Sequence, residues 1–467
     1  MHLMRALNEK YIRINCGVAF NLDALQGVLQ SAGVNGMATT YDAWQTTFFF
    51  NNIANDAGGQ DVTVDLDKSL PKNAALQAGA KAAAAQLTAT LKAGVDKAIE
   101  SAGAQLGATD WTVVWGPQVL CIDPVYLSVR WEAPTPTARF NAANALFVVY
   151  SPTLARYVVA IAATNFKSFY DWLKEDFAVA TVVAWDGALQ VWNGGTNDTQ
   201  PSDQVPCIST ATYTGITNLL GIVDTQITQQ TLVTFLKGLT PPSGTTLTFT
   251  GHSLAGALSP TLAMACFDPT AGLLRGGSWA AGDAMIYATA GATPGNAPFA
   301  ALVNGTAWAG GDQTGSQPWQ IWNHDMYNNV DVVPHAWGAA MLDAIPGYYG
   351  TYYGALTTDL ITHLISHARA YAKKGEAVAG PYTPINNQAL NPEGQSAAFD
   401  EFVSSYKVAE GGGEVIEYLT PAQAAAVSPP PTDKTQVSWT EQVLFQHTTA
   451  YGQLILQNPP QPVKSAS

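Results

Sequence analysis

The sequence places a serine at a turn between a short apolar run and a helix-like run, and this is the setting of a nucleophile. Residues 247–250 (LTFT) predict a strand, residues 251–256 (GHSLAG) a sharp turn, and residues 257–267 a helix. A serine at such a turn is lifted out of the sheet, and the N–H of the next residue lies near the helix start. Because acyl transfer requires this geometry, Ser253 is a candidate nucleophile, which needs a base and an orienting carboxylate.

Asp331, in residues 327–335 (YNNVDVVPH), is the candidate for the carboxylate, since we expect it just past the end of a strand. Strand ends at one edge of a sheet are where such sites gather, although an aspartate at a strand end also commonly caps a turn. Its position after Ser253, with histidines still to follow, fits the order Ser, Asp, His that one group of α/β folds uses. We therefore expect Asp331 to orient the base.

The histidines beyond Asp331 are the candidates for the base. His335 lies too close to Asp331 along the chain to suit this role easily. His363 and His367 share one face of a predicted helix, while His447 lies in the last segment of the chain. We expect His447 to be the base, with His367 as the alternative. Histidines four residues apart also occur in metal sites, but no Asp or Glu completes such a site convincingly, so no metal is predicted.

Four blocks of the chain resemble the class 3 (fungal-type) triacylglycerol lipases of the α/β-hydrolase superfamily. They are residues 251–258 (GHSLAGAL, similar to the family's GHSLGGAL), 286–296 (IYATAGATPGN), 328–334 (NNVDVVP) and Gln446-His447 with Tyr451. The resemblance covers about residues 145–334 and the last thirty or so residues. It implies an α/β-hydrolase fold in which Ser253, Asp331 and His447 form a catalytic triad.

A fifth block implies the oxyanion hole. Residues 158–165 (VVAIAATN) resemble the family's strand that ends in Arg-Gly-Thr or Arg-Gly-Ser. Thr164 would then bind the negative oxygen of the tetrahedral intermediate together with the N–H of Leu254. The chain departs from the family's pattern at two places. The family's Arg-Gly is Ala162-Ala163 here, and the glycine two residues after the nucleophile is Ala255.

In that family the segment after the oxyanion strand forms a lid. Here it is residues 165–177, which carry an apolar face at helical spacing, made by Phe166, Phe169, Tyr170 and Leu173. Such a helix either covers an apolar cleft and opens on a lipid surface, or packs permanently on the sheet. Both interpretations fit the pattern.

The elements that must position these residues predict an α/β fold with a mostly parallel central sheet. Strands are expected at residues 111–115, 145–150, 157–163 and 284–288, and helices at 73–108, 216–236 and 358–374. We expect a helical N-terminal extension (1–143) with a long Ala-rich helix, which packs on the fold or covers the site. A hydrolase core (144–339), cap insertions (340–430) and a C-terminal segment that returns the histidine to the core (431–467) follow.

Composition narrows the classes of partner. The chain has 467 residues, 21 Lys and Arg against 35 Asp and Glu, a net charge of −14 and only 12% charged residues. Nucleic acid is therefore not expected as a partner, because phosphate binding needs clustered cations. The four cysteines show no C-x-x-C spacing, which indicates neither a zinc nor a redox motif and leaves disulfides open.

The chain shows neither a signal peptide nor a transmembrane stretch. Residues 1–15 carry four charges and no continuous apolar core, and no stretch of transmembrane length lacks polar breaks. We expect a soluble protein, secreted only if a leader has been removed.

The expected function is that of a lipase or carboxylesterase that hydrolyses acylglycerols or other apolar esters without a cofactor. Its partner is then a lipid or apolar ester, which an oil–water interface would present. The alternatives are a phospholipase or polyester hydrolase on the same triad, or a non-catalytic lipid-binding protein on a decayed hydrolase fold.

Overall fold

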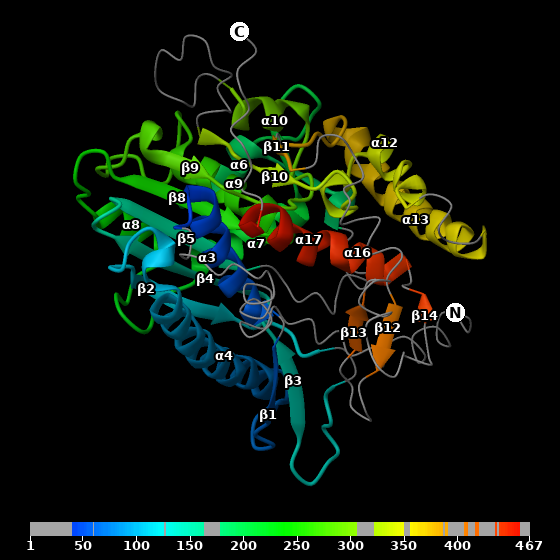
Figure 1. Ribbon diagram of the computed structural model, residues 1–467, viewed down its shortest axis with the longest axis horizontal. Helices are drawn as coiled ribbons and strands as arrows, with labels where there is room; N and C mark the ends of the chain where they lie inside the picture. The colour runs from blue at the N-terminus through cyan, green and yellow to red at the C-terminus, as the bar shows by residue number, and fades with distance from the viewer. Residues whose placement is uncertain are drawn as a thin grey trace.

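The structure is a computed structural model (Figure 1). The residues that it describes are 40–58, 60–125, 128–162, 178–305, 322–349, 355–385, 388–390, 406–409, 416–419, 435–436 and 439–457.

A five-stranded sheet forms the centre of the molecule. Its strands lie in the order β2 (Thr112–Leu120), β4 (Asn144–Ser151), β5 (Arg156–Ala162), β8 (Thr246–Gly251) and β9 (Ala284–Ile286). The pairs β5/β8 and β8/β9 are parallel, whereas β2/β4 and β4/β5 are antiparallel. Parallel bridges extend β9 toward the short strand β10 (Met326–Tyr327). The α/β class is thereby confirmed.

The sheet is mixed, where the sequence indicated a mostly parallel one. The physical reason is the short connection between β4 and β5, which consists of residues 152–155. A parallel neighbour needs a crossover of a dozen or more residues, so this short turn dictates an antiparallel pair. The connection from β5 to β8 is long and contains helices, as a parallel crossover requires.

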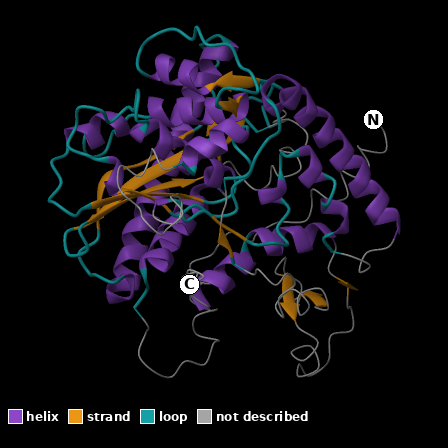
Figure 2. Ribbon diagram, turned by 90° about the horizontal axis from the view of Figure 1, so that it is seen from above, coloured by secondary structure: helices purple, strands orange, loops and turns teal. Residues whose placement is uncertain are grey.

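Alternate residues of the buried strands face two separate hydrophobic cores. On β4, Leu146 and Val148 face one core, whereas Phe147 and Val149 face the other. This period of two is what a strand that is buried on both faces requires. Figure 2 shows helices on both faces of the sheet.

The first core lies under the N-terminal helices α3 (Ala43–Gly58) and α4 (Lys72–Ala102). The predicted long helix is confirmed in α4, which buries Leu87, Leu91 and Val95 and packs against β2. Gly103, at φ 49°, ends it, because glycine adopts a positive φ without strain.

The second core lies under α9 (Leu254–Phe267), with α6 (Trp185–Trp192), α7 (Thr210–Gly221) and α8 (Leu232–Gly238) beside it. Almost every residue of α9 is buried, which is why its sequence shows no polar face.

The single helix predicted over residues 216–236 is wrong, because α7 and α8 are separate. Asp224 lies between them and accepts hydrogen bonds from the backbone N–H groups of Gln226, Ile227 and Thr228. Those bonds give the backbone an alternative to helical pairing. Thr231 then starts α8, where its side chain accepts a hydrogen bond from the Thr234 N–H.

The C-terminal part of the chain adds helices at one end of the sheet. The predicted helix over 358–374 is confirmed within α13 (Ala355–Ala379). It shares a hydrophobic cluster with α16 (Trp439–His447), through Ile361, Ile365 and Val443. The short helix α17 (Thr449–Gly452) and the π-helical turn η8 (Gln453–Gln457) follow α16.

The remaining elements are short. They are β1 (Asp61–Asp65), η1 (Gly103–Leu106), β3 (Thr137–Asn141), η3 (Ala178–Ala180), β6 (Val182–Ala184), β7 (Cys207–Ser209), η4 (Ala281–Asp283), α10 (Ala297–Val303), η5 (Val333–His335), α12 (Ala339–Leu342), η6 (Ile345–Gly347), β11 (Gln388–Ala389), β12 (Tyr406–Ala409), β13 (Ile416–Leu419) and β14 (Thr435–Gln436). In the part of the chain described, no helix is long and apolar enough to cross a membrane.

The division of the chain into four regions stays a prediction. Strand β2 lies inside the predicted N-terminal extension and is nevertheless an edge strand of the central sheet, paired with β4.

Candidate active site

Ser253 lies on a strained turn between β8 and α9. Its backbone has φ 63° and ψ −125°, a conformation that non-glycine residues rarely adopt. The side chain is half-buried. Strain of this kind is a property of the nucleophile elbow, where a sharp turn presents a serine above the sheet.

Two glycines allow the turn to be this tight. A Cβ at Gly251 would collide with the Ala255 carbonyl, and one at Gly256 would collide with the Thr289 carbonyl and lie 2.7 Å from Gly291 Cα. Only residues without a side chain let the strand, the turn and the helix approach so closely.

Ala255, where the lipase pattern has glycine, fits without strain. It lies in the first turn of α9, is fully buried, and is not among the described residues with positive φ. A methyl group therefore costs no backbone strain at this position. Leu254, the first residue of α9, has one of the N–H groups that a helix start leaves without an internal partner.

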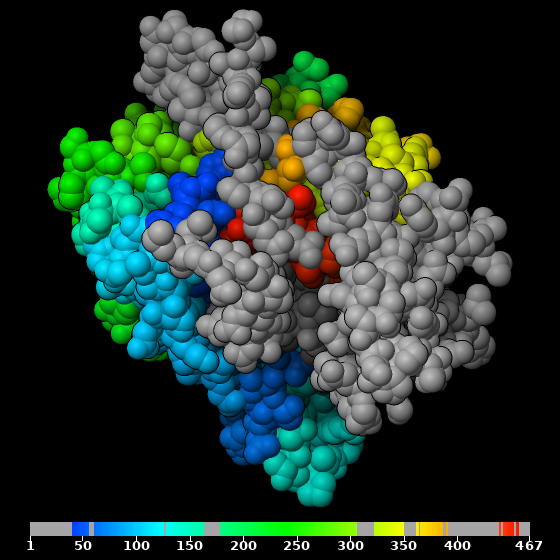
Figure 3. Space-filling model, in the orientation of Figure 1, coloured from blue at the N-terminus to red at the C-terminus, as the bar shows by residue number. Residues whose placement is uncertain are grey.

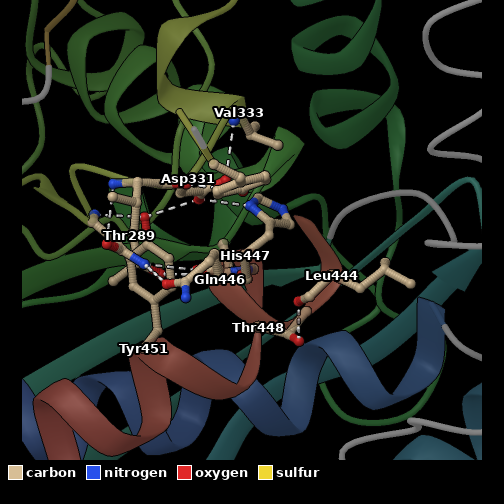
Figure 4. A network of polar contacts seen from close by, with 12 residues as sticks. Thr289, Asp331, Val333, Leu444, Gln446, His447, Thr448 and Tyr451 are labelled. Carbon is tan, nitrogen blue, oxygen red and sulfur yellow. Dashed lines mark hydrogen bonds and ion pairs between the residues drawn. The ribbon is translucent and has the colours of Figure 1, made fainter. Parts of the chain in front are cut away.

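Asp331 and His447 form a buried pair at the same edge of the sheet (Figure 4). His447 Nδ1 lies 2.7 Å from Asp331 Oδ2, and neither side chain is exposed to solvent. An ionised carboxylate only accepts hydrogen bonds, so Nδ1 carries the proton in this contact. In the neutral ring Nε2 is then the nitrogen that can take a proton.

Asp331 has further donors that stabilise its charge away from water. The Val333 N–H donates to Oδ1 at 3.0 Å, and the Tyr451 hydroxyl donates to Oδ2 at 3.0 Å. The Asn328 N–H in turn donates to the Tyr451 oxygen at 2.9 Å. Hydrogen bonds from these donors offset the cost of burying an ionised carboxylate.

The loop that carries Asp331 and the helix that carries His447 are tied together. The Asn328 amide donates to the backbone and the side-chain oxygens of Gln446, at 3.0 and 2.8 Å. His447 is the last residue of α16, and a helix C-terminus favours a positive charge. The red C-terminal helices lie in the middle of the face drawn in Figure 3.

His252, the neighbour of Ser253, contacts His447 directly. Its Nε2 lies 2.6 Å from the His447 carbonyl oxygen, and the two ring centroids are 4.7 Å apart. Its Nδ1 lies 2.9 Å from Thr289 Oγ1. Burial, with a smaller contribution from His447, holds the pKa of His252 well below its usual range. The residue next to Ser253 thus contacts the histidine of the Asp331 pair.

The alternative base lies elsewhere. His367 is exposed on α13, and its ring contacts that of His363 at a centroid distance of 4.8 Å. Thr164 and the lid positions Phe166, Phe169, Tyr170 and Leu173 lie outside the described residues.

Ser253, Asp331 and His447 were predicted from the sequence as site residues, but the residues that hold them in place were not. Only histidines beyond Asp331 were considered as the base, which left out His252. Thr289 lies within the block 286–296 but was given no role, and Asn51 lies in none of the blocks. A signal was nevertheless present for Asn51, which follows Phe48-Phe49-Phe50. A polar residue within so apolar a helix is expected to be buried with a partner.

No cation site is formed by the residues described: they contain no group of three or more His, Cys, Asp or Glu side chains that could hold a metal ion. Cys121, Cys207 and Cys266 are buried free thiols.

Comparison with known proteins gives a likeness in structure. No family model matches the sequence, and no curated protein matches it. The structure is similar to that of the M37 lipase, with 19% identity, a TM-score of 0.52, and coverage of 91% of this chain and 95% of that one.

Two fungal lipase structures are more distant. The lipase from Rhizopus microsporus var. chinensis is 15% identical, with a TM-score of 0.33 over 66% of this chain and 79% of that one. Lipase II from Rhizopus niveus is 15% identical, with a TM-score of 0.33 over 59% and 77%. On the likeness to the M37 lipase and its own sheet topology, the chain has the α/β-hydrolase fold, which the resemblance of its sequence to the lipases of that superfamily implied.

Proposed function

We propose that this protein is a serine ester hydrolase that acts on acylglycerols or other apolar esters. Ser253 is the nucleophile, His447 the base and Asp331 the carboxylate that orients the base. The observation that carries the proposal is the 2.7 Å contact between His447 Nδ1 and Asp331 Oδ2, fully buried, beside a serine with positive φ. This combination has the geometry of a hydrolase triad, and a structural role explains neither the strain nor the buried histidine–carboxylate contact as well.

The reaction follows from these positions. His447 Nε2 takes the proton from the Ser253 hydroxyl as its oxygen attacks the ester carbonyl carbon. The tetrahedral oxyanion is bound by the N–H of Leu254 at the start of α9, and by Thr164 as a second donor. His447, now an imidazolium between Asp331 and the α16 C-terminus, protonates the leaving alcohol. Water then cleaves the acyl-enzyme, with His447 as the base once more.

The contacts favour His447 over His367 as the base. His447 is held by Asp331 through its ring and by the neighbour of Ser253 through its backbone. His367 is exposed and its ring contacts that of His363, whereas the ring of His447 contacts a buried carboxylate.

A fluorophosphonate probe tests the central claim, because it reacts only with an activated serine. The wild-type protein should be labelled at Ser253, and Ser253→Ala should lose labelling and lower p-nitrophenyl ester hydrolysis by about a thousandfold or more. Ser259→Ala is a matched control, since Ser259 is buried within α9 and has no part in the proposed chemistry. Full activity of Ser253→Ala would refute the proposal, and an unlabelled wild type would favour the non-catalytic, lipid-binding alternative.

The substrate class is proposed from the resemblance and from the low charge of the chain, 12% of residues. Hydrolysis of triacylglycerol, phospholipid and polyester should be compared at equal enzyme concentration. A preference for phospholipid or polyester would replace the acylglycerol proposal while keeping the same triad. Turnover that rises above the solubility limit of a long-chain ester would support a lid at residues 165–177.

A further inference from the structure

A chain of hydrogen bonds leads from the N-terminal helix α3 to the backbone of His447. The His447 carbonyl can only accept, so His252 Nε2 carries the proton in their 2.6 Å contact. Burial keeps the pKa of His252 low and the ring neutral, and Nδ1 is therefore an acceptor. The hydroxyl of Thr289 then donates to Nδ1 at 2.9 Å.

Helix α3 supplies the next bond in this chain. Asn51 Nδ2 donates to the Thr289 oxygen at 3.1 Å, and both side chains are fully buried. The Thr289 hydroxyl thus accepts from Asn51 and donates to His252, and the direction of donation runs on from His252 to His447. Buried networks in which every role is filled fix one arrangement of their members.

The same helix holds the chain beyond His447. Gln45 Nε2 donates to the carbonyl oxygens of Ile455 and Leu456, at 3.1 and 3.3 Å. Gln45 and Asn51 therefore bind the C-terminal segment at two places, one of them at His447 itself through His252. Helix α3 packs on β5 and β8 of the central sheet, so it is a fixed support.

We propose that His252 is a positioning residue for the base, and that α3 fixes its orientation through Asn51 and Thr289. Asp331 orients the ring of His447, while His252 places its backbone relative to the nucleophile elbow. The inference rests on the proposed function and deepens it, because it assigns the N-terminal helix to the machinery of that site. A displacement of about 1 Å in such a group can lower the rate by roughly a hundredfold.

Thr289→Val tests this without a change of volume, since it removes only the hydroxyl that fixes the His252 ring. We expect kcat for a soluble p-nitrophenyl ester to fall about 10- to 100-fold with little change in KM. Thr289→Ser, which restores the hydroxyl, should recover most of kcat. The proton resonance of the His447 N–H bonded to Asp331 should broaden or shift in the valine variant and return in the serine variant.

Thr261→Val is the matched control. Thr261 is also fully buried, and its hydroxyl donates to the Ala257 carbonyl at 2.7 Å, inside α9. It should lose similar stability with kcat unchanged. If Thr289→Val fails to fold, Asn51→Leu decides, because it removes the donor to Thr289 and leaves His252 in place.

The outcomes separate the two proposals. A wild-type protein that the fluorophosphonate does not label refutes the proposed function itself. A labelled wild type whose folded Thr289→Val or Asn51→Leu variant keeps the wild-type kcat overturns the positioning role alone. A serine variant as slow as the valine variant also overturns it, since the loss would then not follow the hydroxyl.

Discussion

Two buried carboxyl groups near the end of the sheet differ in their partners. Asp331 has three hydrogen-bond donors, whereas neither carboxyl oxygen of Asp325 has a partner among the described residues. Burial raises the pKa of Asp325 well above its usual value. An acid of this kind stays protonated to a higher pH than an exposed carboxyl group does.

Asp325→Asn should therefore change the pH dependence of stability. The pKa of Asp325 is higher in the folded state than in the unfolded state, so folding is favoured when the group is protonated and is opposed as the pH rises. Each pH unit above the unfolded pKa, up to the folded one, costs the wild type about 1.4 kcal/mol. The asparagine variant lacks this loss, so its Tm relative to wild type should be higher at about pH 7 than at about pH 5.

Asp224→Asn serves as a control of opposite sign. Burial raises the pKa of Asp224, but the backbone N–H groups that it accepts outweigh this effect and lower it. That variant should lose more stability at neutral than at acidic pH. A Tm difference for Asp325→Asn that does not vary with pH would contradict the buried-acid interpretation.

Single residues show where sequence reasoning worked and where it stopped. Ser253 was predicted because the local chain dictates the turn, and Asp331 and His447 were predicted from the order Ser, Asp, His, to which the resemblance then added support. His252 and Thr289 could not be predicted in their roles, since their contact joins segments 37 residues apart. Hydrogen bonds between distant segments depend on the register of β8 against β9, which no local pattern encodes.

At the scale of elements, the close packing of α9 against the backbone that follows β9 constrains the position of Ser253. Gly256 in α9 packs directly on the backbone of Thr289 and Gly291. The same stretch of backbone receives the Ser253 N–H, which donates to the Thr289 carbonyl at 3.1 Å. Any residue that pushes α9 away from this stretch also moves the serine.

Gly256→Ala should therefore destabilise the protein by about 1–3 kcal/mol and slow labelling of Ser253, because backbone atoms on both sides must shift. Gly94→Ala is the matched control within a helix. Gly94 is exposed in α4, and a Cβ there would meet nothing within 4 Å. That variant should gain about 0.5–1 kcal/mol, since alanine favours the helix. Thermal unfolding measures the change in stability of both variants, and a change of the same sign in both would contradict this interpretation.

The prediction of elements was accurate where periodicity alone decides and poor where a side chain intervenes. The long face of α4 has a regular spacing, so its existence followed from the pattern. The break between α7 and α8 depends on one carboxylate, Asp224, that binds successive N–H groups. The antiparallel pairing of β4 with β5 was likewise not predicted, because it depends on the short length of the connection between these two strands.

For the molecule as a whole, charge is sparse and one-sided. The net charge is −14 with 12% charged residues, and the ion pairs Lys92–Asp96 and Arg369–Asp343 are exposed. Exposed pairs contribute about 0–1 kcal/mol each to stability, so screening them with salt costs little stability. Repulsion among the excess carboxylates is the larger effect.

Sodium chloride should therefore raise Tm slightly at neutral pH, because it screens repulsion over distances beyond about 8 Å. The rise should shrink at about pH 4–5, where many carboxylates become neutral. A scanning-calorimetry series at increasing salt checks this, and a fall in Tm at neutral pH would show that the ion pairs matter more than the net charge.

The position of His447 also has a consequence in time. His252 and His447 are 195 residues apart along the chain. At a synthesis rate of about 5–20 residues per second, roughly 10 to 40 seconds separate the appearance of the elbow from that of its base. Under the proposed function, a growing chain therefore holds an unactivated serine for this interval, and ester hydrolysis begins only after synthesis has passed α16.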